Sequence, residues 1–134
     1  MSEGAGSGRW FAAVLAESTD GPVLPGVSAG VQCEVTGGPV PVVSHWVLAD
    51  GALNEAAAGP SVGPEPPDVT VRLDGEVARA LRTGALDPSV AWMQGRIRAD
   101  GSMRSWIALL AATATPEFRR FRERVTEITA ERDR

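Results

Sequence analysis

The sequence predicts an α/β domain, and three observations support that prediction. Apolar and polar residues alternate over 27–36, 42–49 and 69–74, which is the period of strands with one buried face. Apolar residues recur at helical spacing over 103–110 and 118–128, which is typical of helices with one buried stripe. Asp-Gly, Asp-Pro and Gly-Pro pairs stand between these segments and mark turns.

A helix and two strands are predicted in the first part of the chain. The helix should end before the turn at Asp20-Gly21-Pro22. Its apolar side comprises Trp10, Phe11, Val14 and Leu15. The alternation is complete from Val27 to Thr36, and Val42 to Ala49 is predicted to be the partner strand. Cys33 falls on the apolar face of the first strand, and Trp46 shares one face of the second strand with Leu48.

The middle of the chain is predicted to form strands around a proline-rich loop. A short strand is expected at 56–59, although alanine-rich segments are poor strand formers. A loop must follow over 59–67, because that stretch holds four prolines and two glycines. Asp74 ends the next strand, 69–74, and can cap the following helix, which Gly84 is suited to end. The apolar face of that helix comprises Val77, Ala78 and Leu81.

Three more helices and one strand complete the predicted order. Asp87-Pro88 opens a short helix, with Asp as the N-cap and Pro in the first helical position. A strand is predicted at 96–99, and Asp100-Gly101 should turn the chain into the helix over 103–110. Thr115-Pro116-Glu117 starts the last helix. Its apolar stripe is Phe118, Phe121, Val125 and Ile128, and interleaved Arg and Glu favour a solvated, salt-bridged opposite face.

Residues 68–103 carry a resemblance to a known family. A D-x-T strand is followed by L-R-T-G-A-L-D-P and then by A-W-M-Q-G-R-I-R-A-D-G-S-M. This run resembles the signature of the sterol carrier protein 2 (SCP2-like) lipid-binding domain family. The matching positions are Thr83, Gly84, Leu86, Pro88, Ala91, Met93, Gln94, Gly95, Ile97, Gly101 and Met103.

The resemblance implies a more specific fold than the periodicity does. It implies a mixed, mostly antiparallel sheet of about five strands with helices on one face, as in the SCP2-like domain. It also implies an internal hydrophobic tunnel for lipids. At 134 residues the chain has room for one core, so residues 9–134 are expected to form a single SCP2-like domain. Residues 1–8 are expected to be a flexible N-terminus.

Charge and composition limit the expected partners. The formal net charge of −4 gives no electrostatic reason to expect nucleic acid. No stretch approaches the roughly 18–20 apolar residues that cross a bilayer, so no transmembrane segment is expected. The N-terminus lacks the basic start of a signal peptide. A single cysteine excludes an internal disulfide and fits a reducing cytosol, so a cytoplasmic protein is expected. The sequence does not predict its oligomeric state.

The sequence offers no recognisable catalytic or metal-binding machinery. A metal site needs several converging ligands, whereas the one His and the one Cys fall on different predicted strands. His45 is therefore expected to be a hydrogen-bonded strand residue, and Cys33 a small apolar one. Ser44 and His45 are adjacent in a strand, so their side chains leave on opposite faces and cannot form a triad with Asp50. Neither a metal nor a cofactor is expected.

The candidate ligand-binding residues are mostly large apolar side chains. Met adapts to ligands of different shape, and Trp adds wide apolar area. Pattern alone favours an ordinary core, whereas the resemblance implies that these elements line a tunnel. Gln94 matches the Gln of the family, and would either bond a ligand's polar end or cap the strand. The candidates are Trp46, Leu81, Trp92, Met93, Gln94, Met103, Trp106, Ile107, Leu110, Phe118, Phe121 and Val125.

Three functions stay open at this point. The resemblance implies non-catalytic binding or transfer of a hydrophobic small molecule, which would be fatty acyl, sterol or polyketide-like. A cyclase-like enzyme with a small apolar pocket would instead orient a reactive chain, using Gln94, His45 or an arginine as its one polar contact. A helper module with a collapsed tunnel is the third, because Trp92 and Trp106 are bulky. The last helix would either close the tunnel as a lid or pack permanently.

Overall fold

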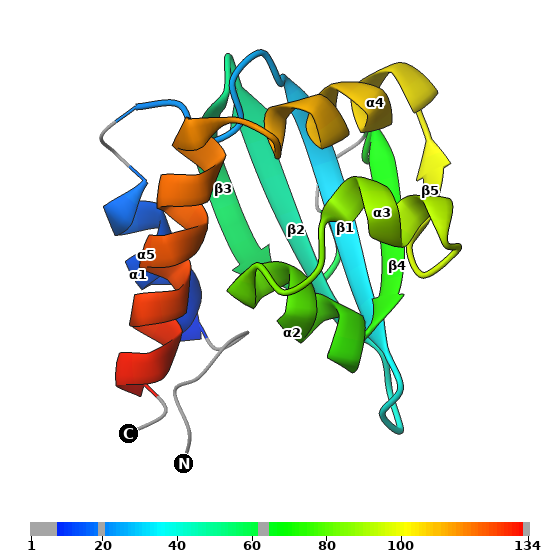
Figure 1. Ribbon diagram of the computed structural model, residues 1–134, viewed down its shortest axis with the longest axis horizontal. Helices are drawn as coiled ribbons and strands as arrows, with labels where there is room; N and C mark the ends of the chain where they lie inside the picture. The colour runs from blue at the N-terminus through cyan, green and yellow to red at the C-terminus, as the bar shows by residue number, and fades with distance from the viewer. Residues whose placement is uncertain (1–7, 19–20, 62–64, 133–134) are drawn as a thin grey trace.

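A five-stranded sheet backed by helices organises the chain (Figure 1). The structure is a computed structural model in which the described residues are 8–18, 21–61 and 65–132. The predicted flexible N-terminus lies outside these residues except for Gly8, at which the first helix begins. The elements are α1 (Gly8–Glu17), β1 (Ala29–Thr36), β2 (Val42–Ala49), β3 (Ala52–Ala58), β4 (Val69–Asp74), α2 (Gly75–Thr83), α3 (Pro88–Met93), β5 (Arg98–Gly101), α4 (Met103–Ala112) and α5 (Pro116–Arg132).

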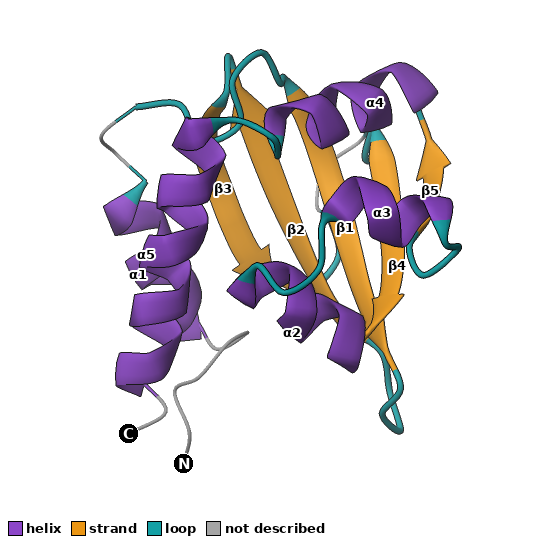
Figure 2. Ribbon diagram, in the orientation of Figure 1, coloured by secondary structure: helices purple, strands orange, loops and turns teal. Residues whose placement is uncertain are grey.

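The sheet is mixed and the helices lie on one side of it, as predicted. Its strand order is β3-β2-β1-β4-β5, in which β1 and β4 are parallel and the other neighbouring pairs are antiparallel. Helices α2, α3 and α4 cross the face of the sheet, and α5 lies alongside α1 near β3 (Figures 1 and 2). Within the described residues, no helix combines the length and apolar character needed to cross a membrane.

The inner face of the sheet is apolar because the pairing of the long strands places their apolar residues side by side. Val31 of β1 pairs with Trp46 of β2 on one side and with Val69 of β4 on the other. Next to this main core, a second buried cluster joins α1 to β3 and α5, and it consists of Trp10, Phe11, Val14, Ala56, Val125 and Ile128. The Nε1–H of Trp10 donates to Thr129 Oγ1 at 2.9 Å, which fastens α1 to α5.

Two strands have different bounds from those predicted. β3 begins at Ala52 rather than at residue 56, because the Asp50-Gly51 turn carries the chain straight into pairing with β2. β5 covers Arg98–Gly101 instead of 96–99, so Asp100 and Gly101 belong to the strand and not to a turn. Their backbones pair with Thr70 and Val69 of β4. Pairing partners, rather than local propensity, therefore set these strand ends.

The start of the proline-rich loop covers His45 on the outer face of β2. His45 is buried, and its Nδ1 lies 3.0 Å from the Gly59 carbonyl oxygen. Its Nε2 lies 2.9 Å from Glu55 Oε1, and the Ser61 backbone N–H donates to Gln32 Oε1 at 3.2 Å. Both ring nitrogens therefore face acceptors, which confirms His45 as a hydrogen-bonded strand residue. The bond to the Gly59 carbonyl and then the bond to Glu55 raise the pKa of His45, against the opposing effect of burial.

We expect stability to depend on the protonation of His45. Because the folded-state pKa of His45 is raised, its protonated ring should stabilise the fold fully below the ordinary pKa of 6.5. This stabilisation should be lost as pH rises through the folded-state pKa. Urea unfolding of the wild type from pH 5.5 to 8.5 should show this decline. His45→Gln should lose about 1–3 kcal/mol at the acidic end and show less pH dependence. A wild-type stability that varies with pH no differently from that of His45→Gln would contradict the assignment.

Candidate apolar binding site

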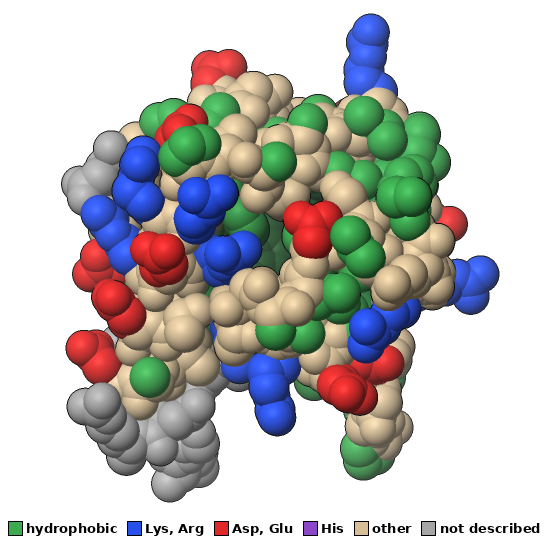
Figure 3. Space-filling model, in the orientation of Figure 1, with side chains coloured by type: hydrophobic (Ala, Val, Ile, Leu, Met, Phe, Trp, Pro, Cys, Tyr) green, Lys and Arg blue, Asp and Glu red, His purple; other side chains and the backbone are tan. Residues whose placement is uncertain are grey.

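Two apolar cavities lie between the inner face of the sheet and the helices. The first, of about 470 Å³, reaches Ser44 and Arg79, and the second, of about 340 Å³, reaches Trp106 and Phe118. Both are bordered by Cys33, Trp46, Leu73, Leu81, Arg82 and Val125. Because these six residues are shared, the two cavities adjoin. Figure 3 shows a hollow between α2, α3, α4 and α5, with hydrophobic side chains inside it.

The floor of both cavities is the inner face of the sheet. Alternation along the strands places Cys33, Trp46 and Leu73 on this face. Cys33 pairs with Val71 of β4, and Val71 borders the second cavity together with Val31. Polar strand residues such as Glu34 face the other side of the sheet, where Glu34 Oε1 accepts from Arg72 Nε at 3.0 Å. The floor therefore presents apolar groups, one thiol and the hydroxyl of Ser44.

One wall is formed by α2, whose ends are fixed by local sequence. Asp74 is the N-cap and its Oδ1 accepts from the Val77 backbone N–H at 2.8 Å. Gly84 ends the helix in the left-handed conformation, with a φ of 84°. Between these caps, α2 presents Leu81 and Arg82 to both cavities.

The opposite walls come from α4 and α5. Ser102 caps α4 by accepting from the Ser105 backbone N–H at 3.1 Å, and the helix then presents Trp106 and Leu110 to the second cavity. The rings of Trp106 and Trp92 meet edge to face, with centroids 6.0 Å apart. The two indoles therefore pack on each other, and the second cavity persists beside them.

Seven of the twelve predicted site residues border the cavities. They are Trp46, Leu81, Trp106, Leu110, Phe118, Phe121 and Val125. The other five lie elsewhere: Trp92 supports Trp106, and Gln94 is the exposed C-cap of α3. Met93, Met103 and Ile107 are 81%, 53% and 48% exposed, because they lie on the sides of α3 and α4 that face away from the sheet. Ligand contact by any of the twelve stays a prediction.

Several residues of the cavity walls were missing from the predicted set. For those on β1 and β4, the signal is the alternation of these strands, which places them on the inner face without showing that they border a void. They are Val31, Cys33, Val71 and Leu73, together with Ile97, Leu109 and three arginines, Arg79, Arg82 and Arg122. The arginines gave no signal, because charged residues on helices ordinarily face solvent.

The Cys33 thiol offers a direct measure of this environment. Burial, and secondarily the charge of Glu34, raises the pKa of Cys33 from 9.0 to about 11. The thiol is therefore protonated at neutral pH and poorly nucleophilic. We expect alkylation by iodoacetamide at pH 8 to be about 100-fold slower in the folded protein than in urea. The reason is that raising the thiol pKa from 9.0 to about 11 lowers the fraction of thiolate at this pH by about 100-fold. Equal rates in the two states would show that Cys33 is not enclosed.

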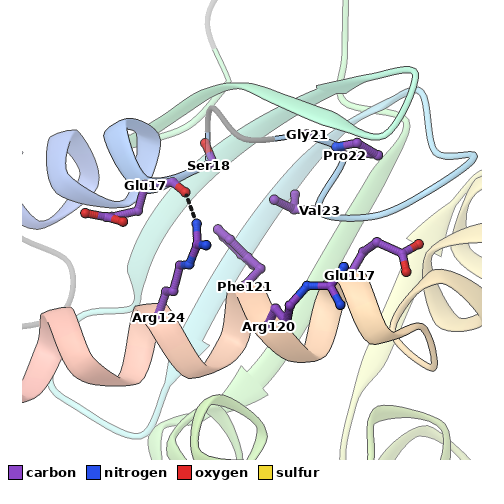
Figure 4. A pocket seen from close by; sticks show the side chains of 9 residues that line it. All are labelled: Glu17, Ser18, Gly21, Pro22, Val23, Glu117, Arg120, Phe121 and Arg124. Carbon is purple, nitrogen blue, oxygen red and sulfur yellow. Dashed lines mark hydrogen bonds between the residues drawn. The ribbon is translucent and has the colours of Figure 1, made fainter.

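A smaller pocket of about 160 Å³ lies on the other side of Phe121 (Figure 4). Its rim is polar: Glu117, Arg120 and Arg124 border it, and Arg124 Nη1 donates to the Glu17 carbonyl oxygen at 3.1 Å. Phe121 borders both this pocket and the second cavity. Nowhere in the described part of the chain do three or more His, Cys, Asp or Glu residues gather as a metal site would require.

The mixed sheet, the helices on one side and the apolar space between them define a small α/β domain of the cavity-containing type. The profile of the SCP-2 sterol transfer family matches residues 11–109, and the chain belongs to this family. The matched range contains the whole motif on which the resemblance was based. No curated protein matches the chain.

Solved structures with the same fold include sterol carrier proteins. A conserved hypothetical protein from Thermus thermophilus has a TM-score of 0.70 at 18% identity, over 92% of this chain and 93% of that one. A crystal structure of sterol carrier protein 2 has a TM-score of 0.69 at 19% identity, over 89% and 98%. Sterol carrier protein 2 like 2 from Aedes aegypti has a TM-score of 0.58 at 23% identity, over 77% and 88%. At these identities the likeness establishes the fold.

Proposed function

We propose that the protein binds, and transfers, a lipid or similar hydrophobic small molecule in the space between its sheet and helices. The observation that carries the proposal is the pair of adjoining apolar cavities, of about 470 and 340 Å³. Pockets that enclose small ligands commonly measure about 300–1,000 Å³. Membership of the SCP-2 sterol transfer family supports the same function. In this proposal the cavities join into the tunnel that the resemblance implies.

Affinity would come mainly from apolar burial. A chain in the cavities gains about 25 cal/mol for each Å² of apolar surface removed from water. The walls offer Trp46 and Trp106 as broad apolar contacts, so ligands whose apolar parts have related shapes should gain similar free energy from burial. Movement of α5 would widen the hollow for an entering ligand, because Phe118, Phe121 and Val125 form part of the wall. The Trp10–Thr129 and Arg124–Glu17 bonds hold α5 against α1.

The cavity walls favour a carrier over a cyclase-like enzyme. Among the described residues, no His, Asp or Glu borders either cavity. His45, which was a candidate polar contact, lies on the outer face of the sheet under the loop. Acid–base chemistry on a bound chain would therefore have no His or carboxylate beside it, and the raised pKa of Cys33 makes its thiol a poor base. The cavities also favour a carrier over a helper module with a collapsed core.

Extraction and titration together test the proposal. Native mass spectrometry of the purified protein should detect a bound lipid, which organic extraction then identifies. The delipidated protein should bind a fluorescent fatty-acyl probe or a fluorescent sterol, and the emission of Trp46 and Trp106 should change because both border the cavities. A protein that carries no lipid and binds neither probe would refute the proposal.

A further inference from the structure

We infer that the bound molecule carries an anionic group, held by Arg82 of α2 and Arg122 of α5, with its apolar chain in the cavities. This inference rests on the proposed function and narrows its ligand class to anionic amphiphiles. A molecule whose single polar group is a neutral hydroxyl would use the same apolar walls but would leave both guanidinium groups without a partner.

The charges on the cavity walls are all positive. Arg79 and Arg82 border the first cavity, and Arg82 and Arg122 border the second. No acidic side chain borders either cavity among the described residues, although the whole chain has a formal charge of −4. Cys33 does not offset these charges, because its raised pKa keeps the thiol neutral. An anionic group is the complement of this set of charges.

Several side-chain N–H groups of the walls have no acceptor among the described residues. The buried indole N–H of Trp106 has no acceptor among the described residues. In contrast, Ser44 Oγ already accepts from Trp46 Nε1 at 3.0 Å, and Thr113 Oγ1 already donates to the Leu110 carbonyl oxygen at 2.6 Å. Neither the Arg82 nor the Arg122 guanidinium makes a hydrogen bond or ion pair within the described residues. A ligand that supplies acceptors would satisfy these groups.

The two arginines are held at one place, where α2 ends against α5. Thr126 Oγ1 lies 3.0 Å from the backbone carbonyl oxygens of both Arg82 and Arg122. The Arg122 guanidinium packs over Gly84, and a Cβ at Gly84 would lie 3.0 Å from its Cζ. The guanidinium therefore lies at the C-terminal end of α2, where the helix dipole favours a positive charge. This fixes Arg122 beside the end of the helix that carries Arg82.

Basic side chains also flank the hollow. Figure 3 shows basic side chains beside the hollow on its α5 side, while an acidic side chain lies on the opposite rim, near α3. Arg82 and Arg122 are half-buried, so solvent screens them less than it screens a fully exposed arginine. Their planar guanidinium groups suit a carboxylate, which accepts two parallel bonds from one arginine. The apolar chain would then run inward over Cys33 and Leu73.

Paired ligands and paired variants test this inference. The delipidated protein is titrated with palmitate and with hexadecanol, which share the chain and differ in charge. Palmitate should bind the wild type at least about 10-fold more tightly. The double variant Arg82→Gln/Arg122→Gln should weaken palmitate binding by about 10- to 100-fold and change hexadecanol binding by less than about 2-fold. Circular dichroism and thermal unfolding confirm that the variant is folded.

A matched control separates local contact from total charge. Arg104→Gln/Arg119→Gln removes the same charge from exposed positions on α4 and α5 that border neither cavity, and it should leave palmitate affinity unchanged. Equal losses in both double variants would overturn the assignment to Arg82 and Arg122. Equal binding of palmitate and hexadecanol would overturn the inference and leave the proposed function intact. Failure of both ligands to bind would overturn the inference, and failure of the fluorescent sterol as well would refute the proposed function itself.

Discussion

Replacing Cys33 by Phe is expected to reduce the affinity for an apolar ligand by about 100-fold. Cys33 borders both cavities from the floor of the sheet, so a Phe ring at this position would occupy space in each. If the ring excludes four methylenes of a bound chain, the loss is about 3 kcal/mol, at about 0.8 kcal/mol for each methylene. Titration with the fluorescent fatty-acyl probe measures this loss.

The stability of the same variant tells whether the void is real. A ring that enters existing empty space gains apolar contacts, so the free energy of unfolding should stay unchanged or rise by about 1 kcal/mol. A ring forced into a filled core would instead cost about 1–3 kcal/mol. Val71→Phe, from the neighbouring position on β4, should reproduce the effect in the second cavity.

The control for Cys33→Phe places the same ring outside the cavities. Val47 lies on β2, where it pairs with Gly30 of β1 and Glu55 of β3, and it borders neither cavity. Val47→Phe should therefore bind the probe as the wild type does. If Cys33→Phe also retains full affinity while remaining folded, the ligand does not lie in these cavities.

Local chemistry explains why most of the fold could be predicted. Asp74 and Asp87 cap α2 and α3 by accepting from backbone N–H groups three residues later, and these are interactions that sequence alone can suggest. Gly84 adopts the left-handed conformation for the same local reason. In contrast, the start of β3 at Ala52 and the end of β5 at Gly101 depend on a partner strand. A propensity argument cannot include such a partner.

The candidate site was less predictable, because a void is a property of packing. Alternation placed Cys33 on the inner face, but it could not show that the space opposite is empty. Helical spacing likewise grouped Met103 and Ile107 with Trp106, although Trp106 lies on the buried side of α4 and the other two lie on its exposed side. Arg122 was assigned to a solvated face by its charge, and its position over Gly84 follows from the contact between α2 and α5.

Gly101→Ala is expected to lower the free energy of unfolding by about 3–5 kcal/mol. Gly101 has a φ of 115°, and a Cβ there would overlap the Asp68 carbonyl oxygen. Asp68 cannot move away easily, because that oxygen accepts from the Ser102 backbone N–H at 2.7 Å. Its carboxylate accepts from the Gly30 backbone N–H at 2.7 Å, which fixes the residue to β1 as well.

The matched control for Gly101→Ala is Gly59→Ala. Gly59 also has a positive φ, of 97°, but nothing lies within 4 Å of a Cβ built there. That variant should lose only the strain of the backbone conformation, about 1 kcal/mol. The difference between the two, measured by urea unfolding, therefore reports the clash at Asp68. Gly101→Ala should also weaken probe binding, because Ser102 caps the helix that carries Trp106. Equal losses of stability in the two variants would show that β5 and β4 are not packed as closely as the structure has them.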